Sequence, residues 1–339
     1  MSSQPIDPPT STRHIVLARR PHGRPVPEDF RLETVALPEL RDGQILVANS
    51  VMSVDPYMRG RMNDVKSYID PFRLDEPLDG GAVGEVIASR SGDVPVGVTV
   101  LHGLGWREHA VLDGRRAQVV DVSQVSESAY LGVMGMPGLT AYAGLMAAGE
   151  FSPGDAVFVS GAAGAVGSLV VQIAKASGAS RVIGSAGSAE KVARVLELGA
   201  DAAFDYHDGV GDQLEAAAPD GIDLYFDNVG GEHLEAAIEA MNDDGHIALC
   251  GAISAYNASE PPPGPRNLFR AIGKRLTMRG FIVGKYAGLN AEFREKMTGW
   301  LRDGEVRFDE TFRDGLENAP QAFIDLLDGA NTGKMVVRL

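Results

Sequence analysis

The chain has 339 residues, 44% hydrophobic and 23% charged, which is the balance of a folded globular protein with room for two domains. Its formal net charge of -15 argues against a nucleic-acid partner, because phosphate backbones select basic surfaces. The single cysteine, Cys250, excludes a disulfide within the chain and fits a reducing compartment. No run reaches the ~18 apolar residues of a membrane span. Residues 1–12 lack the apolar core of a signal peptide, so we expect a loose tail and a cytoplasmic protein.

Residues 13–130 have the pattern of short strands separated by glycine and proline. Apolar runs at 45–54, 80–88 and 98–102 predict three of these strands. Prolines recur throughout this part and leave little room for long helices. We therefore expect an antiparallel, β-rich domain.

From about residue 134 the pattern changes to alternating helices and strands. Strands are expected over 156–160, 181–185, 222–226, 246–250 and 277–283, and helices over 136–148, 165–177, 189–198, 232–241, 291–301 and 320–327. This alternation predicts a parallel sheet with helices on both faces. A last strand, 335–339, is expected to rejoin the β-rich part. The predicted domains are therefore 1–130 with 300–339, and 131–299.

The turn after the strand at 156–160 matches the dinucleotide-binding fingerprint with one departure. Ala162 stands at the first glycine position, whereas Gly164 and Gly167 occupy the other two. Gly164 lets the backbone approach a pyrophosphate, and the N-terminus of the following helix offers N–H groups to the anion. The turn predicted to bind the cofactor consists of Ala162, Ala163, Gly164, Ala165, Val166 and Gly167.

The end of the next strand bears on the choice between NAD and NADP. An NAD enzyme usually carries Asp or Glu there to hold the ribose 2′-hydroxyl. No acid occurs here before Glu190, and Gly187, Ser188 and Lys191 would suit a 2′-phosphate. The sequence therefore favours NADP(H), although a lysine at this place is also typical of a solvated helix face.

A catalytic or structural zinc site is not expected. Zinc sites need Cys, His and carboxylate ligands at suitable spacings. One cysteine and seven histidines cannot supply a four-cysteine site, and neither His102 nor His109 has a cysteine nearby. We predict no metal.

Six longer motifs occur in order along nearly the whole chain, at 20–23 (RPHG), 53–62 (SVDPYMRGRM), 135–142 (GMPGLTAY), 227–231 (DNVGG), 250–257 (CGAISAYN) and 315–320 (GLENAP). Together they resemble the zinc-free medium-chain dehydrogenase/reductases, in particular the leukotriene B4 dehydrogenase/prostaglandin reductase branch and its bacterial curcumin reductases. The resemblance implies a Rossmann doubly wound parallel sheet beside a β-rich GroES-like domain, in a homodimer. It also implies NADPH-dependent, zinc-independent reduction of the C=C bond of α,β-unsaturated ketones or aldehydes.

The resemblance also carries over to individual residues. Lys191 and Tyr206 would hold the adenosine phosphate, Asn228 the ribose or pyrophosphate, and Asn331 would close over the cofactor. The nicotinamide half would be lined by Cys250, Gly251, Ala252, Ile253, Ser254, Tyr256, Phe281, Ile282 and Val283, and the substrate by Tyr57 and Met136. The candidate catalytic residue is Tyr256, whose hydroxyl would stabilise the enolate oxygen that forms when hydride adds to the β-carbon.

Each assignment has a packing alternative. Cys250 and Phe281 suit a buried sheet, Asn228 and Asn331 suit turns, and Tyr57 would pack in a loop after Pro56. Two other functions also stay open, a zinc-free NADPH quinone reductase and a cofactor-binding scaffold without catalysis; the intact motif around Tyr256 argues against the scaffold. The sequence does not name the enone, because the loops that would select it, 62–78 and 257–270, have no derivable shape.

Overall fold

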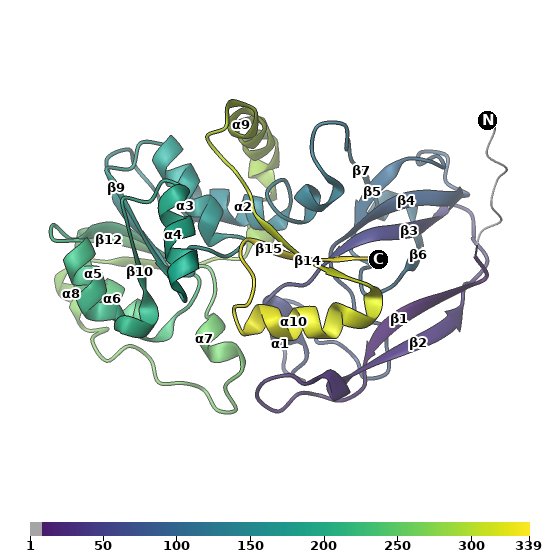
Figure 1. The fold of residues 1–339 in the computed structure, drawn as a ribbon, viewed down its shortest axis with the longest axis horizontal. Helices are drawn as coiled ribbons and strands as arrows, with labels where there is room; N and C mark the ends of the chain where they lie inside the picture. The colour runs from purple at the N-terminus through teal and green to yellow at the C-terminus, as the bar shows by residue number, and fades with distance from the viewer. Residues whose placement is uncertain (1–8) are drawn as a thin grey trace. The chain divides into compact units, whose positions relative to one another are not determined.

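The computed structural model describes residues 9–339, which divide into two compact units (Figure 1). The first unit contains residues 9–131, 312–328 and 335–339, and the second contains 132–311 and 329–334. The expected boundary at 300 is therefore too early. Helix α9 (Asn290–Asp303) runs past it and buries Phe293 and Met297 in the second unit.

The second unit is built on a six-stranded parallel sheet. Its strand order is β10-β9-β8-β11-β12-β13, so the unit's first strand in the sequence, β8, lies in the middle of the sheet. This is the doubly wound Rossmann order, so the predicted fold class is confirmed. The strands are β8 (Ala156–Val159), β9 (Arg181–Ala186), β10 (Ala202–Asp205), β11 (Ile222–Asp227), β12 (Met241–Leu249) and β13 (Thr277–Gly280).

Helices cover both faces of this sheet. Phe158, Tyr225 and Ile247 point toward one face, where they pack with Leu214 and Ile238 from α5 and α6. Helices α3 and α4 contact β8, β9 and β10. The helices are α2 (Met136–Ala143), which continues as a π-helix over Gly144–Ala148, α3 (Gly167–Ala176), α4 (Ala189–Glu197), α5 (Val210–Ala217), α6 (Gly231–Ala240), α7 (Ile253–Tyr256), α8 (Arg270–Gly273) and α9, with 3-10 turns at Tyr206–Asp208 and Val283–Leu289.

The first unit is a β-rich structure, as predicted. One sheet has the order β14-β15-β3-β4-β5-β7, with β6 also paired to β3, and a separate ribbon joins β1 and β2. The strands are β1 (Ser11–Leu17), β2 (Phe30–Ala36), β3 (Gln44–Ser53), β4 (Ala82–Ser89), β5 (Thr99–His102), β6 (His109–Asp113), β7 (Gln118–Val119), β14 (Glu310–Asp314) and β15 (Lys334–Arg338); the helices are α1 (Tyr57–Arg61) and α10 (Ala319–Leu327), and 3-10 turns lie at Pro27–Asp29, Gly114–Arg116, Glu127–Leu131 and Leu316–Asn318. The C-terminal strand pairs antiparallel with β3 through Val336 and Ser53, which confirms that it rejoins this part of the chain.

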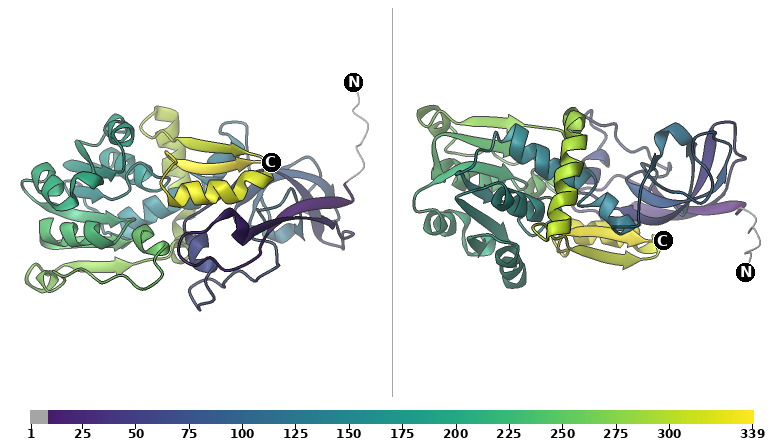
Figure 2. Two further views of the ribbon diagram at one scale, coloured as in Figure 1. Left: turned by 60° about the horizontal axis from the view of Figure 1, so that its bottom comes forward. Right: turned by 90° about the horizontal axis from the view of Figure 1, so that it is seen from above.

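The core of the first unit lies between its strands and α10. Met52, Trp106, Phe323 and Met335 are fully buried together, and Figure 2 shows α10 running beside the C-terminal strands, all in yellow. The joint burial of these apolar side chains explains why the C-terminal segment folds with the N-terminal β-rich part of the chain rather than with the residues that precede it in the sequence.

Two local expectations are wrong. The expected tail over residues 1–12 is too long, because Ser11 and Thr12 belong to β1 and pair with Ala36 and Val35; residues 1–8 lie outside the described part. Tyr57 opens α1 and does not lie in a loop. Within residues 9–339, no helix has both the length and the apolarity needed to cross a bilayer.

Candidate cofactor and active site

The glycine-rich turn lies directly between β8 and α3. A Cβ atom at Gly167 would come within 2.4 Å of the carbonyl oxygen of Gly161, so this position admits no side chain. The amide of Gly164 donates to the same carbonyl at 3.0 Å, which closes the turn. As a result, α3 begins tightly against the sheet with its N-terminus at the carboxyl end of β8, where anions bind.

The alanine at the first glycine position is accommodated by a glycine on the neighbouring strand. Ala162 is fully buried, and its amide donates to the carbonyl of Ser185 at 2.8 Å. A Cβ at Gly184 would lie 2.8 Å from the Cβ of Ala162. The departure from the fingerprint therefore leaves the turn intact, because Gly184 provides the space for the extra methyl group.

The chain segment 329–334 lies against this turn. The amide of Gly333 donates to the carbonyl of Ala163 at 2.8 Å, and Gly333 bridges Gly164. Asn331 is buried, and its side-chain amide donates to the carbonyl of Gly333 at 2.7 Å. The structure thus brings Asn331 beside the predicted cofactor turn, where it also holds its own segment in place.

The end of β9 presents a cation and no acid. Ser188 caps α4 by accepting from the amide of Lys191, and the Lys191 ammonium donates to the carbonyl of Gly329. Burial lowers the pKa of Lys191, and no carboxylate within residues 9–339 forms an ion pair with it. A half-buried ammonium bonded to a neutral carbonyl has its charge available for an anion, so this end of the strand fits a 2′-phosphate.

Tyr206 belongs to the same corner of the second unit. A Cβ at Gly187 would lie 2.6 Å from the Tyr206 hydroxyl, so that hydroxyl sits directly over the backbone that follows β9. The Tyr206 ring is 37% exposed and lies 4.3 Å from the ring of His207, measured between centroids. Gly187, Ser188, Lys191 and Tyr206 are therefore brought together, as the sequence predicts for the adenosine end.

The next two strands position Asn228 and the loop over residues 250–256. The side-chain amide of Asn228 donates to the carbonyl of Ser160 at 2.8 Å, which ties it to the residue before the glycine-rich turn. The amides of Cys250 and Gly251 both donate to the carbonyl of Asp227, at 2.9 and 3.0 Å. The 250–256 loop, with Ala252, Ile253 and Ser254, thus begins at the carboxyl edge of the sheet.

Tyr256 ends the short helix α7 in this loop and is half-buried. Its hydroxyl lies 3.5 Å from the amide nitrogen of Ala252, and a Cβ at Gly251 would lie 3.4 Å from it. The phenol is therefore folded back over the start of the loop, at the edge where a parallel sheet places its ligand.

Four residues predicted to line the nicotinamide half behave differently from one another. Burial raises the pKa of the Cys250 thiol to about 12, which disfavours the reactive thiolate. Phe281 is buried, and its ring centroid lies 6.2 Å from that of Phe226, whereas Ile282 is 41% exposed. The expected strand 277–283 ends early, at Gly280, because the pairing of β13 with β12 stops there opposite Leu249. Val283 consequently opens a 3-10 turn and is half-buried.

The two predicted substrate residues lie in different units. Tyr57 is half-buried against the core of the first unit, and burial raises the pKa of its phenol. Met136 opens α2 in the second unit and is 41% exposed, and its carbonyl accepts from the Thr140 hydroxyl at 2.7 Å. Their roles in substrate binding stay predictions.

Sequence reasoning misses a buried polar cluster in the second unit. Ser160, Tyr225 and Asp227 are buried and hydrogen-bonded to one another at the carboxyl ends of β8 and β11. Asp227 opens the 227–231 motif, which is a signal that could have identified it. Ser160 and Tyr225 carry no such signal, because they have the pattern of ordinary strand residues.

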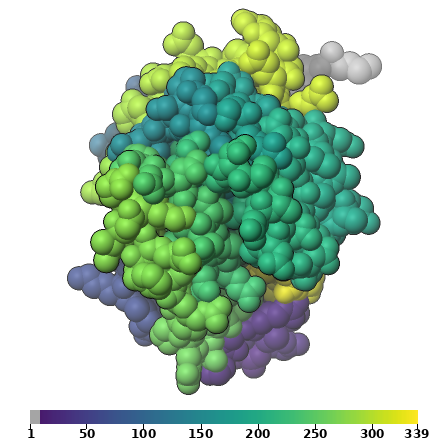
Figure 3. Space-filling view, turned by 90° about the vertical axis from the view of Figure 1, so that its left-hand side faces the viewer, coloured from purple at the N-terminus to yellow at the C-terminus, as the bar shows by residue number. Residues whose placement is uncertain are grey.

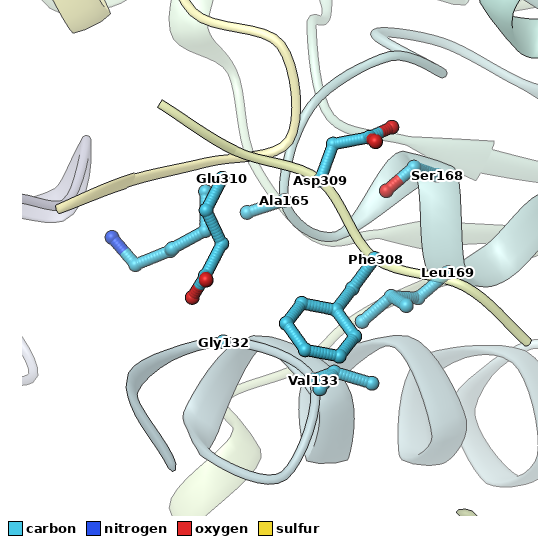
Figure 4. A pocket seen from close by; sticks show the side chains of 9 residues that line it. Gly132, Val133, Ala165, Ser168, Leu169, Phe308, Asp309 and Glu310 are labelled. Carbon is cyan, nitrogen blue, oxygen red and sulfur yellow. The ribbon is translucent and has the colours of Figure 1, made fainter. Parts of the chain in front are cut away.

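A small pocket lies on the other side of the glycine-rich turn. Its cavity volume is only about 10 Å³, and Figure 4 shows the Phe308 ring beside Val133 and Leu169 within it. Pockets for drug-sized ligands are larger, roughly 300–1,000 Å³. A dinucleotide therefore does not fit there, and the carboxyl edge of the sheet remains the candidate site.

Known families match two parts of the chain, and known proteins match nearly all of it. A family described as the N-terminal domain of oxidoreductase matches residues 13–120, and one described as zinc-binding dehydrogenase matches residues 165–302. Within the described residues, no group of three or more His, Cys, Asp or Glu side chains could hold a metal ion. The second family is described as zinc-binding, but residues 9–339 contain no such cluster of zinc ligands.

The NADPH-dependent curcumin reductase of Escherichia coli is 42% identical over 334 residues, covering 96% of this chain and 96% of that protein. Prostaglandin reductase 1 of Sus scrofa is 40% identical over 327 residues, covering 93% and 95%. The crystal structure of CurA in complex with NADPH from Vibrio vulnificus has a TM-score of 0.92 and 43% identity, covering 96% of this chain and 98% of that chain. These similarities extend over both units.

Proposed function

Because the chain belongs to the medium-chain dehydrogenase/reductase family, we propose that it reduces the C=C bond of α,β-unsaturated ketones or aldehydes with NADPH. The observation that carries the choice of cofactor is Lys191 at the end of β9, half-buried and without a carboxylate partner in the described chain. The similarity to the curcumin and prostaglandin reductases supports the reaction.

Different residues of the second unit would bind different parts of the cofactor. The turn over 162–167 would hold the pyrophosphate, and Ser188, Lys191 and Tyr206 the adenosine phosphate. Asn228 would meet the ribose or pyrophosphate, and the 250–256 loop would line the nicotinamide half. We assign substrate binding to Tyr57 and Met136.

When bound, NADPH supplies the hydride that adds to the β-carbon of the enone. Negative charge then develops on the carbonyl oxygen of the substrate. The Tyr256 hydroxyl is the donor that we assign to this oxygen, an effect worth about 3 kcal/mol in comparable sites. The phenol is half-buried at the end of α7, with its hydroxyl 3.5 Å from the amide nitrogen of Ala252.

The test is the loss of NADPH absorbance with a panel of enones, alkenals and quinones, with NADH as the control cofactor. Turnover of enones with NADPH and weak turnover with NADH are expected. Turnover of quinones alone would favour the alternative function, a zinc-free NADPH quinone reductase, which the same fold and cofactor site would also suit. NADPH binding without turnover of any compound would favour a scaffold.

A homodimer is part of the proposal. β13 is an edge strand of the six-stranded sheet, and α8 precedes it with Phe269 and Ile272 exposed by 70% and 82%. Figure 3 looks onto the side of the second unit from which α8 projects. An open edge beside exposed apolar side chains suits pairing with a second copy. Ile272→Asp is expected to shift the mass in light scattering to that of a monomer; an unchanged mass would exclude this surface.

Zinc independence and a cytoplasmic location complete the proposal. The composition supports both, since the chain has a single cysteine. Activity should survive dialysis against a chelator, with no zinc found by elemental analysis. Zinc bound in a fixed ratio, with activity lost on its removal, would refute the zinc-free mechanism. Fractionation of cells should recover the protein with the cytoplasm.

A further inference from the structure

Asp227 is the last residue of β11, and its carboxylate receives four hydrogen bonds on one oxygen. Oδ1 accepts from the backbone amides of Val229 at 2.9 Å and Gly230 at 2.7 Å. It also accepts from the hydroxyls of Tyr225 at 2.6 Å and Ser160 at 3.3 Å. The carboxylate is 1% exposed, so these contacts are shielded from water.

The turn that Asp227 holds supports the loop that carries Tyr256. The carbonyl of Asn228 accepts from the amide of Ile253 at 3.2 Å. The carbonyl of Val229 accepts from Ser254 twice, from its amide at 3.2 Å and from its hydroxyl at 2.6 Å. The start of α7 is therefore hydrogen-bonded to the two residues that follow Asp227 in the chain.

The same cluster reaches the glycine-rich turn through Ser160. The Ser160 hydroxyl accepts from the amide of Asn228 at 2.9 Å, and its oxygen lies 2.9 Å from the Tyr225 hydroxyl, whose single proton is donated to Asp227. Ser160 immediately precedes Gly161, where the turn begins. One buried cluster thus fixes the carboxyl ends of β8 and β11 and the loop after β12 relative to one another.

We propose that Asp227 is a positioning residue of the reductase reaction, which sets the place of Tyr256 by holding the 228–230 turn. The proposal rests on the proposed function. Burial raises the pKa of Asp227, so a carboxylate here is costly unless its donors are fixed. Four donors point at one carboxylate oxygen and stabilise its charge. Two of these donors are backbone amides of the 228–230 turn, so the carboxylate also fixes the conformation of that turn, which an apolar side chain could not do.

The experiment compares Asp227→Ala and Asp227→Asn with Asp223→Ala as a matched control. Asp223 lies at the other end of β11 and also holds the structure together, since it accepts from the amide of Ala156 at 2.8 Å and from Asn242 at 2.8 Å. Asn at 227 keeps one acceptor oxygen with two lone pairs, enough for the amides of Val229 and Gly230. The measurements are kcat and KM for an enone, and hydrogen exchange of the loop without substrate or cofactor.

Asp227→Ala should lower kcat about 10- to 100-fold, the loss expected when a catalytic group is misplaced by about 1 Å, with KM changed less than about twofold. Asp227→Asn should restore most of kcat, and Asp223→Ala should leave it near that of the wild type. Exchange over residues 250–256 should be faster in Asp227→Ala than in either of the other variants. A structural role alone would lower stability without this split between kcat and KM.

Equal kcat in the alanine variants at 227 and 223, or unchanged exchange over 250–256 in Asp227→Ala, would overturn the proposal. If Asp227→Ala does not fold, Tyr225→Phe is the variant that tests the proposal, because it removes one donor to Asp227 and keeps the buried ring. Tyr225→Phe should lower kcat and speed the exchange over 250–256, each by a smaller factor than Asp227→Ala. No change in either quantity would overturn the proposal. If the wild type reduces no enone, the proposed function fails, whereas the exchange measurement still tests the role of Asp227.

Discussion

Lys191→Ala is expected to weaken the binding of NADPH and to leave the binding of NADH nearly unchanged. The Lys191 ammonium is half-buried, and its partner in the second unit is the neutral carbonyl of Gly329. No carboxylate has to be displaced when a phosphate arrives, so most of the charged hydrogen bond contributes to binding. Such bonds are worth about 1.5–3 kcal/mol.

Partial exposure of Lys191 places the effect in the lower half of that range, because solvent screens the charge. A loss of about 1.5–2 kcal/mol corresponds to roughly a 10- to 30-fold increase in the Kd for NADPH. NADH lacks the 2′-phosphate, so its Kd should change by less than about twofold. The ratio of the two Kd values is therefore the quantity that reports on Lys191.

The assay is a fluorescence titration of each dinucleotide, with Lys175→Ala as the control. Lys175 lies on α3 and pairs with Asp201 at 2.9 Å, so its removal should leave both Kd values unchanged. Equal losses for NADPH and NADH would mean that Lys191 contacts a group common to both. Unchanged affinity for both dinucleotides would mean that the 2′-phosphate does not reach Lys191, and the assignment of the phosphate to the end of β9 would be refuted.

The dependence on pH follows from the same residue. The charged ammonium binds phosphate; it is present below the pKa of Lys191 and lost as the pH rises through it. Burial lowers that pKa from the ordinary 10.5, so the affinity for NADPH should begin to fall at a lower pH than an exposed lysine would give. The affinity for NADH should stay level over the same range, and a parallel fall would assign the titration to another group.

Three further results are expected. Tyr256→Phe should lower kcat by about 100-fold with the Kd for NADPH changed less than about twofold; an unchanged kcat would remove the hydroxyl from the reaction. Gly167→Ala should destabilise the fold by about 1–3 kcal/mol in urea denaturation, because the new methyl group would lie 2.4 Å from the carbonyl oxygen of Gly161; unaltered stability would show that the turn can shift. Cys250, with its pKa raised to about 12, should be alkylated at neutral pH at least about a thousandfold more slowly than a free thiol, and rapid labelling would show that the 250–256 loop opens.

Local patterns predict most of the second unit. The strands β8, β9, β11 and β12 are apolar runs, and glycines follow the helices α3 and α4 as expected. The sequence does not predict β10, because Ala202–Asp205 is four residues long and half alanine, a residue that favours helix. It also does not predict α5, whose first residues, Val210 and Gly211, give a weak helical signal.

The amino-acid sequence by itself determined the glycine-rich turn, the absence of an acid at the end of β9 and the alternation of strands and helices that predicts a parallel sheet. These features follow from local periodicity and from residue types at fixed short spacings. Only the tertiary structure decided what surrounds them: the carbonyl of Gly329 lies against Lys191 across 138 residues of chain, and Ser160 reaches Asp227 across 67. Hydrogen bonds between residues so far apart depend on how the whole unit packs, and no local pattern in the sequence encodes them.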